Sequence, residues 1–288
     1  MPVIAVVNRK GGSGKSTLAT HLAAWCAVTG RSAMLGDTDS QGSSSSWLKR
    51  RGASPEARGR EILGWSADPR RVMRPPAGVT HVVLDTPGGL RGLDLAKIVA
   101  AADALILPVG HSVFDRESAA QCVAELRQLS RVAAGRCRIG VVGMRLDART
   151  RGEAVLRAWA EEHGLPFVGA LRETQGYVRC AEQGLTMFDL PAARAQADLD
   201  QWRPILDWLQ PVLSAAPRSA AGVPDEAEPA ARAATPRREP VHRPRFSPST
   251  AQVPLDVLEG PRERGGWLAR VASWFGHATS RRRPLRGT

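Results

Sequence analysis

The chain has 288 residues, 43% of them hydrophobic, and a formal net charge of +12, which predicts one or two domains with a buried core. Its four cysteines form no CxxC pair and no window approaches 18 apolar residues, which argues against a disulfide framework, a zinc site and a membrane-spanning helix. We therefore expect a cytoplasmic protein whose basic charge favours a polyanionic partner, either nucleic acid or an anionic membrane surface.

Residues 1–212 are predicted to form one α/β domain, in which short apolar runs alternate with segments of helical spacing. Runs that are apolar on both faces, with helices between them, predict a mostly parallel sheet with helices on both faces. The expected strands are Val3–Val7, Ser32–Leu35, His81–Leu84, Ala104–Val109, Ile139–Gly143 and Pro166–Leu171, and the expected helices include Ser16–Thr29, Ser118–Ala134 and Arg151–His163.

Two segments of different character follow this domain. Residues 213–262 are dense in Pro, Ala, Arg and Glu and have almost no apolar periodicity, which predicts a disordered, extended linker rather than a further small domain. Residues 263–288 regain helical periodicity, with large apolar side chains inside an arc of about 120° and arginines after them. The apolar side of this predicted amphipathic helix consists of Trp267, Leu268, Val271, Trp274 and Phe275.

A glycine-rich loop connects the first expected strand to the first expected helix. Glycines let the backbone turn so that successive N–H groups point at a phosphate, and the helix N-terminus adds partial positive charge. Lys15 is expected to reach the β- and γ-phosphates, Ser16 to coordinate Mg²⁺, and Thr17 to cap the helix near the α-phosphate. The predicted nucleotide-binding residues are Lys10, Gly11, Gly12, Ser13, Gly14, Lys15, Ser16 and Thr17.

This loop departs from the common P-loop pattern, which has a glycine where Arg9 stands. A second lysine, Lys10, comes directly before the glycine pair. The segment Lys10–Thr17 resembles the deviant Walker A motif of the ParA/MinD family of P-loop ATPases. The resemblance implies that Lys10 is the signature lysine, which crosses to the nucleotide of a partner subunit in an ATP-bound homodimer.

A carboxylate motif, Asp37-Thr38-Asp39-Ser40-Gln41-Gly42, comes directly after the second expected strand. It is similar to the Asp-x-Asp-Pro-Gln-Gly segment of the ParA/MinD family, with Ser40 in place of the usual proline. Carboxylates at the carboxyl ends of strands lie at the crevice where such sheets bind ligands. The resemblance implies that Asp39 positions or polarises the attacking water and that Asp37 supports the metal shell.

A second carboxylate motif is the apolar run His81–Leu84 followed by Asp85. It resembles Walker B, which implies that Asp85 holds Mg²⁺ through water, and Pro87 and Gly88 then shape a switch loop that senses the γ-phosphate. The family resemblance also places Pro108–Asp115 near the dimer interface and the ends of two later strands, Val142–Asp147 and Leu171–Thr174, beside the adenine.

The family resemblance covers about residues 1–210 and implies a slow, partner-stimulated ATPase with ATP and Mg²⁺ as ligands and Lys10, Lys15 and Asp39 as catalytic residues. In this family, ATP favours a dimer that binds a surface, and hydrolysis releases it. The predicted function is to partition or position a cargo, either a plasmid or chromosome locus or a large protein assembly. An activating partner protein is expected.

The surface on which such a cycle runs stays open between DNA and membrane. Arginines in the last third of the domain suit nonspecific DNA contact through counterion release, with ordinary solvated arginines as the alternative. These are Arg172, Arg179, Arg194 and Arg203. The apolar side of 263–288 suits peripheral membrane contact, partner docking or packing on the ATPase domain. The expected location is thus nucleoid-associated or at the inner membrane.

Three alternatives to a cargo-positioning ATPase remain. A non-enzymatic ATP-binding switch or adaptor is compatible with Ser40 and with the serine run Ser43–Ser46. A MinD-like membrane-bound ATPase is compatible with the C-terminal segment. A metal-cluster relative needs closely placed cysteines at a dimer interface, and the lone Cys122 and Cys137 give it little support.

Overall fold

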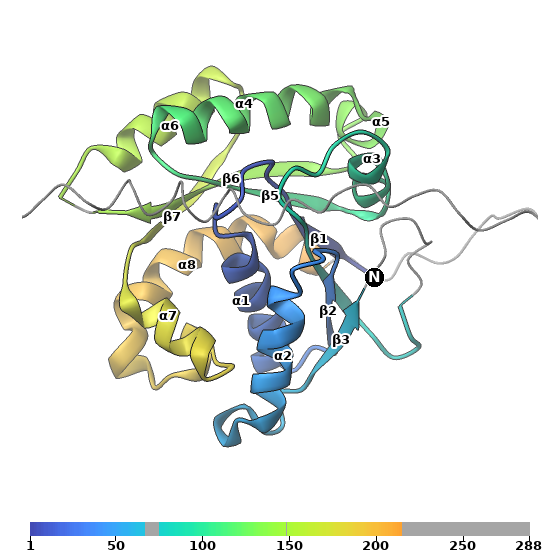
Figure 1. The fold of residues 1–288 in the computed structure, drawn as a ribbon, viewed down its shortest axis with the longest axis vertical. Helices are drawn as coiled ribbons and strands as arrows, with labels where there is room; N and C mark the ends of the chain where they lie inside the picture. The colour runs from blue at the N-terminus through green and yellow to red at the C-terminus, as the bar shows by residue number, and fades with distance from the viewer. Residues whose placement is uncertain (67–74, 148, 215–288) are drawn as a thin grey trace, which may run out of the picture. The chain divides into compact units, whose positions relative to one another are not determined.

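The structure, a computed structural model, describes residues 1–66, 75–147 and 149–214. Seven strands form one sheet in the order β3-β2-β4-β1-β5-β6-β7, and every adjacent pair runs parallel (Figure 1). The strands are β1 (Val3–Val6), β2 (Ala33–Asp37), β3 (Ile62–Ser66), β4 (His81–Asp85), β5 (Ala104–Val109), β6 (Arg138–Leu146) and β7 (Phe167–Arg172). The predicted parallel α/β architecture is confirmed.

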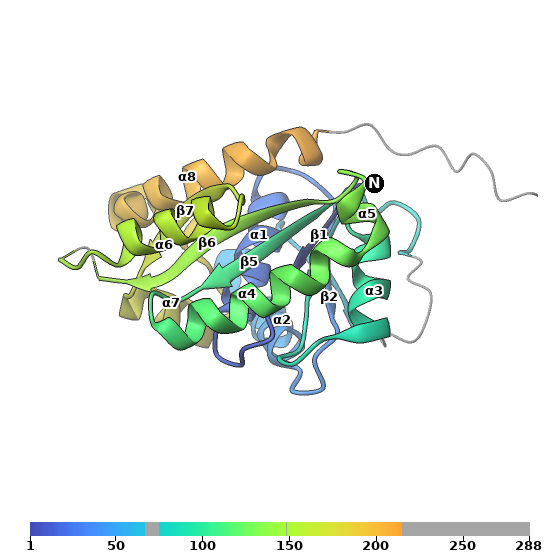
Figure 2. The same ribbon diagram turned by 90° about the horizontal axis from the view of Figure 1, so that it is seen from above.

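Helices cover both faces of this sheet (Figures 1 and 2). Helices α3, α4 and α6 pack on one face, and α1, α2 and α8 pack on the other. The helices are α1 (Lys15–Val28), α2 (Ser43–Ala53), α3 (Gly92–Ala101), α4 (Val113–Gln128), α5 (Ser130–Ala133), α6 (Gly152–Glu162), α7 (Gln175–Glu182) and α8 (Ala192–Leu213), with 3-10 turns η1 (Pro55–Ala57) and η2 (Met187–Asp189).

The central strand β1 shows why the sheet needs helices on both sides. Val3 and Ala5 belong to the core on the α3–α4–α6 face, whereas Ile4 and Val6 belong to the core under α1 and α8. Successive side chains of a strand point to opposite faces, so a run that is apolar throughout must be covered twice. Burying a side chain such as Ile4 stabilises the fold by roughly 1.5–3 kcal/mol.

The six expected strands are all present, with ends that differ by up to three residues. The sequence analysis missed β3, α2, α3 and α7, which are short, contain glycine or are rich in serine. Strand β6 runs longer than expected at both ends, and its pairing with β7 shifts register between Gly143 and Leu146, where Arg145 has a left-handed φ of 54°. The expected helix 118–134 begins earlier, after the N-cap Ser112, and breaks at an extended Leu129.

The last described helix, α8, packs on the sheet through Trp202, Ile205 and Leu209, all three of which are fully buried. It ends at Leu213. The predicted linker beyond Ser214 and the predicted amphipathic segment 263–288 lie outside the described residues. Among the residues that the structure describes, no helix has the length and apolar character needed to span a membrane.

A buried aromatic cluster joins α1 to α7 and α8. The His21 ring stacks on Trp202 with centroids 5.2 Å apart and an interplanar angle of 5°, and lies 5.1 Å from Tyr177. His21 Nδ1 lies 2.8 Å from the Thr17 carbonyl, and the Met187 N–H donates to Nε2 at 3.3 Å. This arrangement requires the neutral ring with the proton on Nδ1, and burial lowers the pKa of His21 to about 4.

His21 therefore predicts a loss of stability in acid. The unfolded chain protonates this ring near pH 6.5, whereas the folded chain does so only near 4, so the unfolded state binds more protons between these values. The free energy of unfolding should fall as pH falls through this window, by at most about 3 kcal/mol from His21. Urea unfolding at several pH values should show that His21→Gln removes this part of the slope.

His163→Gln is the matched control, because the His163 ring makes the same kind of bond to a carbonyl four residues earlier, that of Trp159, but is only half-buried. The His21 assignment is wrong if His21→Gln keeps the wild-type slope, or if His163→Gln flattens it equally.

Candidate functional site

The loop between β1 and α1 has a left-handed backbone, which favours glycine, at two positions. Gly12 and Gly14 have φ values of +69° and +96°, and a Cβ on Gly14 would lie 2.6 Å from Met144 Cε. Gly14 is also the N-cap of α1. The expectation that Thr17 caps the helix is therefore wrong, because α1 already begins at Lys15; Thr17 lies within its first turn.

Lys15 points its ammonium group back into this loop. Its Nζ donates to the Lys10 carbonyl at 3.1 Å, and the side chain is buried. Burial lowers the pKa of Lys15, while the charges of Asp85 and Asp39 act in the opposite direction. The loop thus brings a buried cation and several backbone N–H groups to one place, beside the N-terminus of α1.

The predicted carboxylates lie at the same edge of the sheet as this loop. Strands β2 and β4 pair in parallel with Asp37 opposite Asp85, and β1 pairs with β4 so that Val6 lies opposite Asp85. The strand that precedes the glycine loop and the two strands that end in aspartate therefore finish side by side. This topology unites the three motifs, which are separated by about 20 to 50 residues along the chain.

Asp85 is fully buried at the centre of the site. Its Oδ2 accepts a hydrogen bond from Ser44 Oγ at 2.5 Å, and its Oδ1 has no hydrogen-bond partner among the described residues. Burial, together with the charge of the neighbouring Asp37, raises the pKa of Asp85 to about 6, and the hydrogen bonds from Ser44 and Ser16 and the charge of Lys15 offset part of this shift. An ionised carboxylate held in this position gains from a cation nearby.

Asp37 has a different set of contacts from those of Asp85. Its Oδ1 accepts the Asp39 N–H at 3.1 Å and its Oδ2 accepts the Ser45 N–H at 2.8 Å. The carboxylate therefore holds the N-terminus of α2, where negative charge is favourable. Asp39 is half-buried, and its Oδ1 accepts the Gln41 N–H at 3.0 Å. A role of Asp37 in the metal shell stays a prediction.

Ser44 is a site residue that the sequence analysis missed. The serine run Ser43–Ser46 suggested a loosened motif, but the run forms the first turn of α2 and carries the hydroxyl that binds Asp85. No local pattern indicated this contact, because Ser44 and Asp85 are 41 residues apart along the chain.

The predicted switch loop after Asp85 lies against the glycine loop. The Gly89 N–H donates to the Arg9 carbonyl at 2.6 Å, and Thr86 Oγ1 donates to the Val6 carbonyl at 2.7 Å. A Cβ on Gly88 would lie 3.3 Å from both N and Cα of Gly11, closer than most side chains tolerate. The two loops are thus in contact through their backbones.

Lys10 lies at the rim of the site and is held by α4. Its Nζ is 2.5 Å from Asp115 Oδ1, and its side chain is 39% exposed. Burial raises the pKa of Asp115, but hydrogen bonds from Lys10 and Ser112 outweigh it, and the net pKa lies below its ordinary value. Beside this pair, Phe114 is 71% exposed, and Val113 is exposed as well.

The residues at this edge fit a nucleotide phosphate with a divalent cation. The glycine backbone, the buried Lys15 ammonium and the start of α1 suit phosphate oxygens. Carboxylate and hydroxyl oxygens such as those of Asp85 and Ser16 suit Mg²⁺. Two buried side-chain oxygens at the site, Asp85 Oδ1 and Ser13 Oγ, have no hydrogen-bond partner among the described residues, which is the pattern expected where a polar ligand completes the site.

A hollow of about 520 Å³ begins beside this site at Thr17. It is lined by Thr17, Arg50, Tyr177, Val178, Ala181 and Glu182, from α1, α2 and α7. Its place next to the first turn of α1 suits the part of a nucleotide beyond the α-phosphate. The strand ends that the family resemblance placed beside the adenine, Val142–Asp147 and Leu171–Thr174, belong to β6 and β7, and β7 leads into α7.

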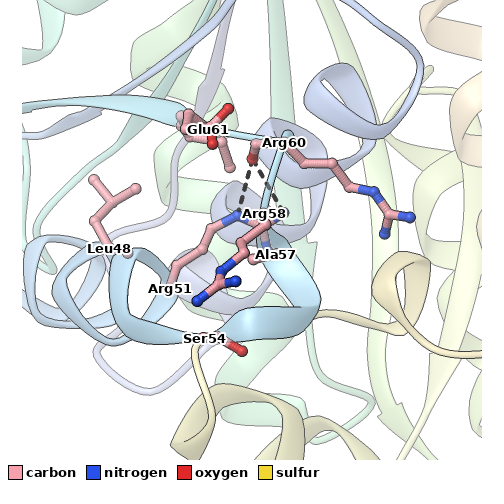
Figure 3. Close-up of a pocket in the computed structure, with 9 residues that line it drawn as sticks. Leu48, Arg51, Ser54, Ala57, Arg58, Arg60 and Glu61 are labelled. Carbon is pink, nitrogen blue, oxygen red and sulfur yellow. Dashed lines mark hydrogen bonds between the residues drawn. The ribbon is translucent and has the colours of Figure 1, made fainter.

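A smaller hollow, of about 130 Å³, lies at the opposite edge of the sheet, between α2, η1 and the start of β3 (Figure 3). Its Arg51 is buried, donates to the Arg60 carbonyl and forms an ion pair with Asp189 at 2.8 Å. A buried guanidinium that is already paired in this way ties α2 to η2. It has no direct contact with the nucleotide motifs.

The four arginines predicted for DNA contact are all exposed. Two of them are paired with carboxylates on α8, Arg172 with Asp198 at 2.7 Å and Arg203 with Asp200 at 3.3 Å. Arg179 lies on α7 and Arg194 on α8. The membrane or partner residues Trp267, Leu268, Val271, Trp274 and Phe275 lie outside the described residues.

The metal-cluster alternative finds no support in the described part of the chain. Cys122 and Cys137 are both buried in the hydrophobic core. Within residues 1–66, 75–147 and 149–214, no group of three or more His, Cys, Asp or Glu side chains is arranged to hold a metal ion.

The chain is similar to known proteins over most of the part that the structure describes. Residues 4–187 match the family model described as the CobQ/CobB/MinD/ParA nucleotide binding domain. The maintenance of carboxysome distribution protein A of Gloeobacter kilaueensis is 34% identical over 207 residues, covering 68% of this chain and 89% of that protein. The chromosome-partitioning ATPase Soj of Thermus thermophilus is 31% identical over 189 residues, covering 54% and 75%.

Among solved structures, the septum site-determining protein MinD of Pyrococcus horikoshii complexed with Mg-ADP has the same fold, with a TM-score of 0.53, 17% identity and coverage of 74% of this chain and 98% of that one. The glycine loop, the two aspartate-ending strands and the family match extend over the same part of the sequence. The chain therefore belongs to the CobQ/CobB/MinD/ParA family of nucleotide-binding proteins.

Proposed function

We propose that this protein is a Mg²⁺-dependent ATPase that dimerises with ATP bound and positions or partitions a cargo by cycling on and off a cellular surface. The observation that carries the proposal is the meeting of Lys10, Lys15 and Asp85 at one edge of the sheet, with Asp39 on the adjoining strand end. Relatives that act in carboxysome distribution and chromosome partitioning support the positioning role.

Each residue of the site has a distinct proposed task. Lys15 and the backbone N–H groups of Gly11–Gly14 bind the β- and γ-phosphates, and Ser16 and Asp85 hold Mg²⁺. When bound, Mg²⁺ neutralises charge that develops on the phosphate oxygens. Asp39 orients the attacking water, and Asp37 keeps Asp39 in place through the backbone N–H that it accepts.

Lys10 supports the proposed homodimer. Its ammonium group is at the rim of the site and its bond to Asp115 is partly exposed to solvent, so the pair is easily exchanged for another. The neighbouring apolar side chains of Val113 and Phe114 are 48% and 71% exposed and adjoin Asp115, so they offer a second copy an apolar contact beside Lys10. A second copy that covers Phe114 would place its own nucleotide within reach of Lys10.

The proposed surface is nucleoid DNA, bound without sequence preference. The formal net charge of +12 and the exposed Arg179 and Arg194 suit phosphate contacts. Membrane binding through residues 263–288 is the competing case. To separate the two cases, a fluorescent fusion of the whole chain is imaged beside one that lacks 263–288. Nucleoid localisation that survives the truncation supports DNA. Localisation at the cell envelope that becomes diffuse after the truncation supports the membrane.

Three substitutions test the ATPase itself. Lys15→Ala should abolish nucleotide binding because it removes the buried phosphate-binding cation. Asp39→Ala should keep ATP-dependent dimerisation but lower the turnover number by about 100-fold, because it removes only the group that orients water. Lys10→Ala should bind ATP as a monomer and fail to dimerise. Fluorescent-nucleotide titration, light scattering and phosphate release, with and without DNA, measure these three properties.

Lys97→Ala is the control for these variants, since Lys97 lies on α3 with its side chain exposed, and its ion pair among the described residues is a long one, with Asp94 at 3.9 Å. It should behave like the wild type in all three assays. An Asp39→Ala protein with wild-type turnover would favour a non-enzymatic switch. A Lys10→Ala protein with an unchanged cycle would contradict the shared site.

A fourth substitution tests the proposed dimer face. Phe114→Ser should weaken ATP-dependent dimerisation by at least about 10-fold, because a large side chain at the centre of an interface carries much of its binding energy. The nucleotide affinity of the monomer should stay within about 2-fold of the wild-type value, because this surface change removes no contact to the ligand. Leu63→Ser, at an exposed position on the edge strand β3, is the control. Equal dimerisation in both variants would rule out this face.

A further inference from the structure

Arg9 occupies the position where the common P-loop has glycine, and its side chain reaches α4. Its Nη2 forms an ion pair with Glu125 Oε2, and its Nη1 lies 3.5 Å from Gln121 Oε1. The two charged side chains are 27% and 22% exposed, so they are only partly screened by solvent. The glycine loop is therefore anchored to α4 by a residue that takes no part in the proposed phosphate contacts.

Glu125 also binds a second partner. Its Oε1 accepts the N–H of Gly92, the first residue of α3, at 2.6 Å. Burial raises the pKa of Glu125, but the hydrogen bonds from Gly92 and Arg9 outweigh it, so the net pKa is lowered and the group stays ionised. A carboxylate that accepts a charged donor on one oxygen and a backbone N–H on the other is fixed in orientation.

The loop from Gly89 to Gly92 is thus fastened at both ends to Arg9. The Gly89 N–H binds the Arg9 carbonyl directly, and the Gly92 N–H binds the Arg9 guanidinium through Glu125. Both glycines have left-handed φ values, +78° and +60°, so this path of the loop is specific. The next residue, Leu93, is 81% exposed.

We propose that Arg9 and Glu125 form a positioning clamp that makes the loop 86–92 and the start of α3 move together with the glycine loop. A change in the glycine loop between ATP and ADP would then move Gly89 and Gly92 together and displace the exposed Leu93. The clamp rests on the proposed ATPase function, and it gives that function a route from the phosphates to the protein surface. Its effect is on coupling rather than on nucleotide binding.

A plain structural role is the alternative, because partly exposed ion pairs contribute little to stability. The two roles differ in what they predict. A structural pair changes only the melting temperature, whereas a clamp also changes how the loop 86–92 differs between the ATP and ADP complexes. The Gly89 and Gly92 amides are direct probes, because each donates to a member of the clamp.

The test uses the full chain with Mg-ADP and with a non-hydrolysable Mg-ATP analogue. Hydrogen exchange is measured for peptides that cover 86–93 in the wild type, Arg9→Gln and Glu125→Gln. Glu125→Gln keeps an acceptor for Gly92 and removes the charge that holds Arg9. We expect the exchange rates of the wild type to differ between the two complexes. In both variants this difference should be at least about 10-fold smaller, while the ADP affinity stays within about 3-fold of the wild-type value.

Two further variants separate the clamp from a stabilising ion pair. Arg157→Gln removes the exposed pair with Glu153 on α6 and should keep the wild-type difference. The exchanged pair, Arg9→Glu with Glu125→Arg, restores opposite charges but leaves no acceptor for the Gly92 N–H. We expect the exchanged pair to regain the wild-type melting temperature but not the wild-type difference in hydrogen exchange between the ATP and ADP complexes.

Each remaining outcome is decisive. If Arg9→Gln, Glu125→Gln or the exchanged pair keeps the wild-type difference, the clamp is refuted and the pair is structural. If the wild type hydrolyses ATP but shows no difference in 86–93, the clamp is refuted and the ATPase function stands. If the wild type binds no nucleotide, the ATPase function fails, and the clamp fails with it.

Discussion

The rest of the site depends on one constraint, the full burial of the Asp85 carboxylate at the carboxyl edge of a parallel sheet. A buried charge is costly unless it is paired or hydrogen-bonded, and here the compensation comes from two separate segments. Ser44 donates from the start of α2, Lys15 contributes charge from the start of α1, and Oδ1 is left for a further polar group. Parallel pairing of β1, β4 and β2 is what brings these segments together. The same pairing puts Asp37 opposite Asp85, which raises the cost of the buried charge and increases the gain from a bound cation.

The parts of the site that follow from local sequence were predictable, and those that depend on distant partners were not. The β1–α1 loop was recognisable because its glycines and Lys15 act within a few residues of one another. The fold class followed from apolar runs that need cover on both faces. By contrast, Ser44 meets Asp85 across 41 residues and Arg9 meets Glu125 across 116. A serine run or an arginine in place of glycine carries no sign of such a partner. Threonine is a common N-cap, which favours Thr17, whereas the left-handed Gly14 caps α1 three residues earlier.

Local propensity also explains the missed elements. The edge strand β3 has the sequence Ile-Leu-Gly-Trp-Ser, whose central glycine weakens the strand pattern; in the sheet, a Cβ on Gly64 would lie 2.9 Å from Leu48 of α2. Helix α2 begins with four serines, which are poor helix formers in water. It is held instead by Asp37 at its N-terminus and by the buried Arg51–Asp189 pair near its end. Tertiary contacts at both ends thus replace the intrinsic preference that the sequence lacks.

Adjacent residues of the glycine loop divide two tasks that a switching ATPase must keep apart. Arg9 and Lys10 both bind carboxylates of α4, but at Glu125 near its end and at Asp115 in its first turn. Glu125 has a second partner in Gly92, so releasing Arg9 would also leave a backbone N–H of α3 without its acceptor. Asp115 keeps its Ser112 contact when Lys10 leaves, so its charge stays partly compensated. The contact of Lys10 with α4 is therefore broken more easily than the contact of Arg9 with α4. In the proposed ATPase, a subunit built in this way would offer Lys10 to a second copy while Arg9 keeps the glycine loop, α3 and α4 in register, so that the proposed dimerisation would be reversible without loosening the proposed phosphate site.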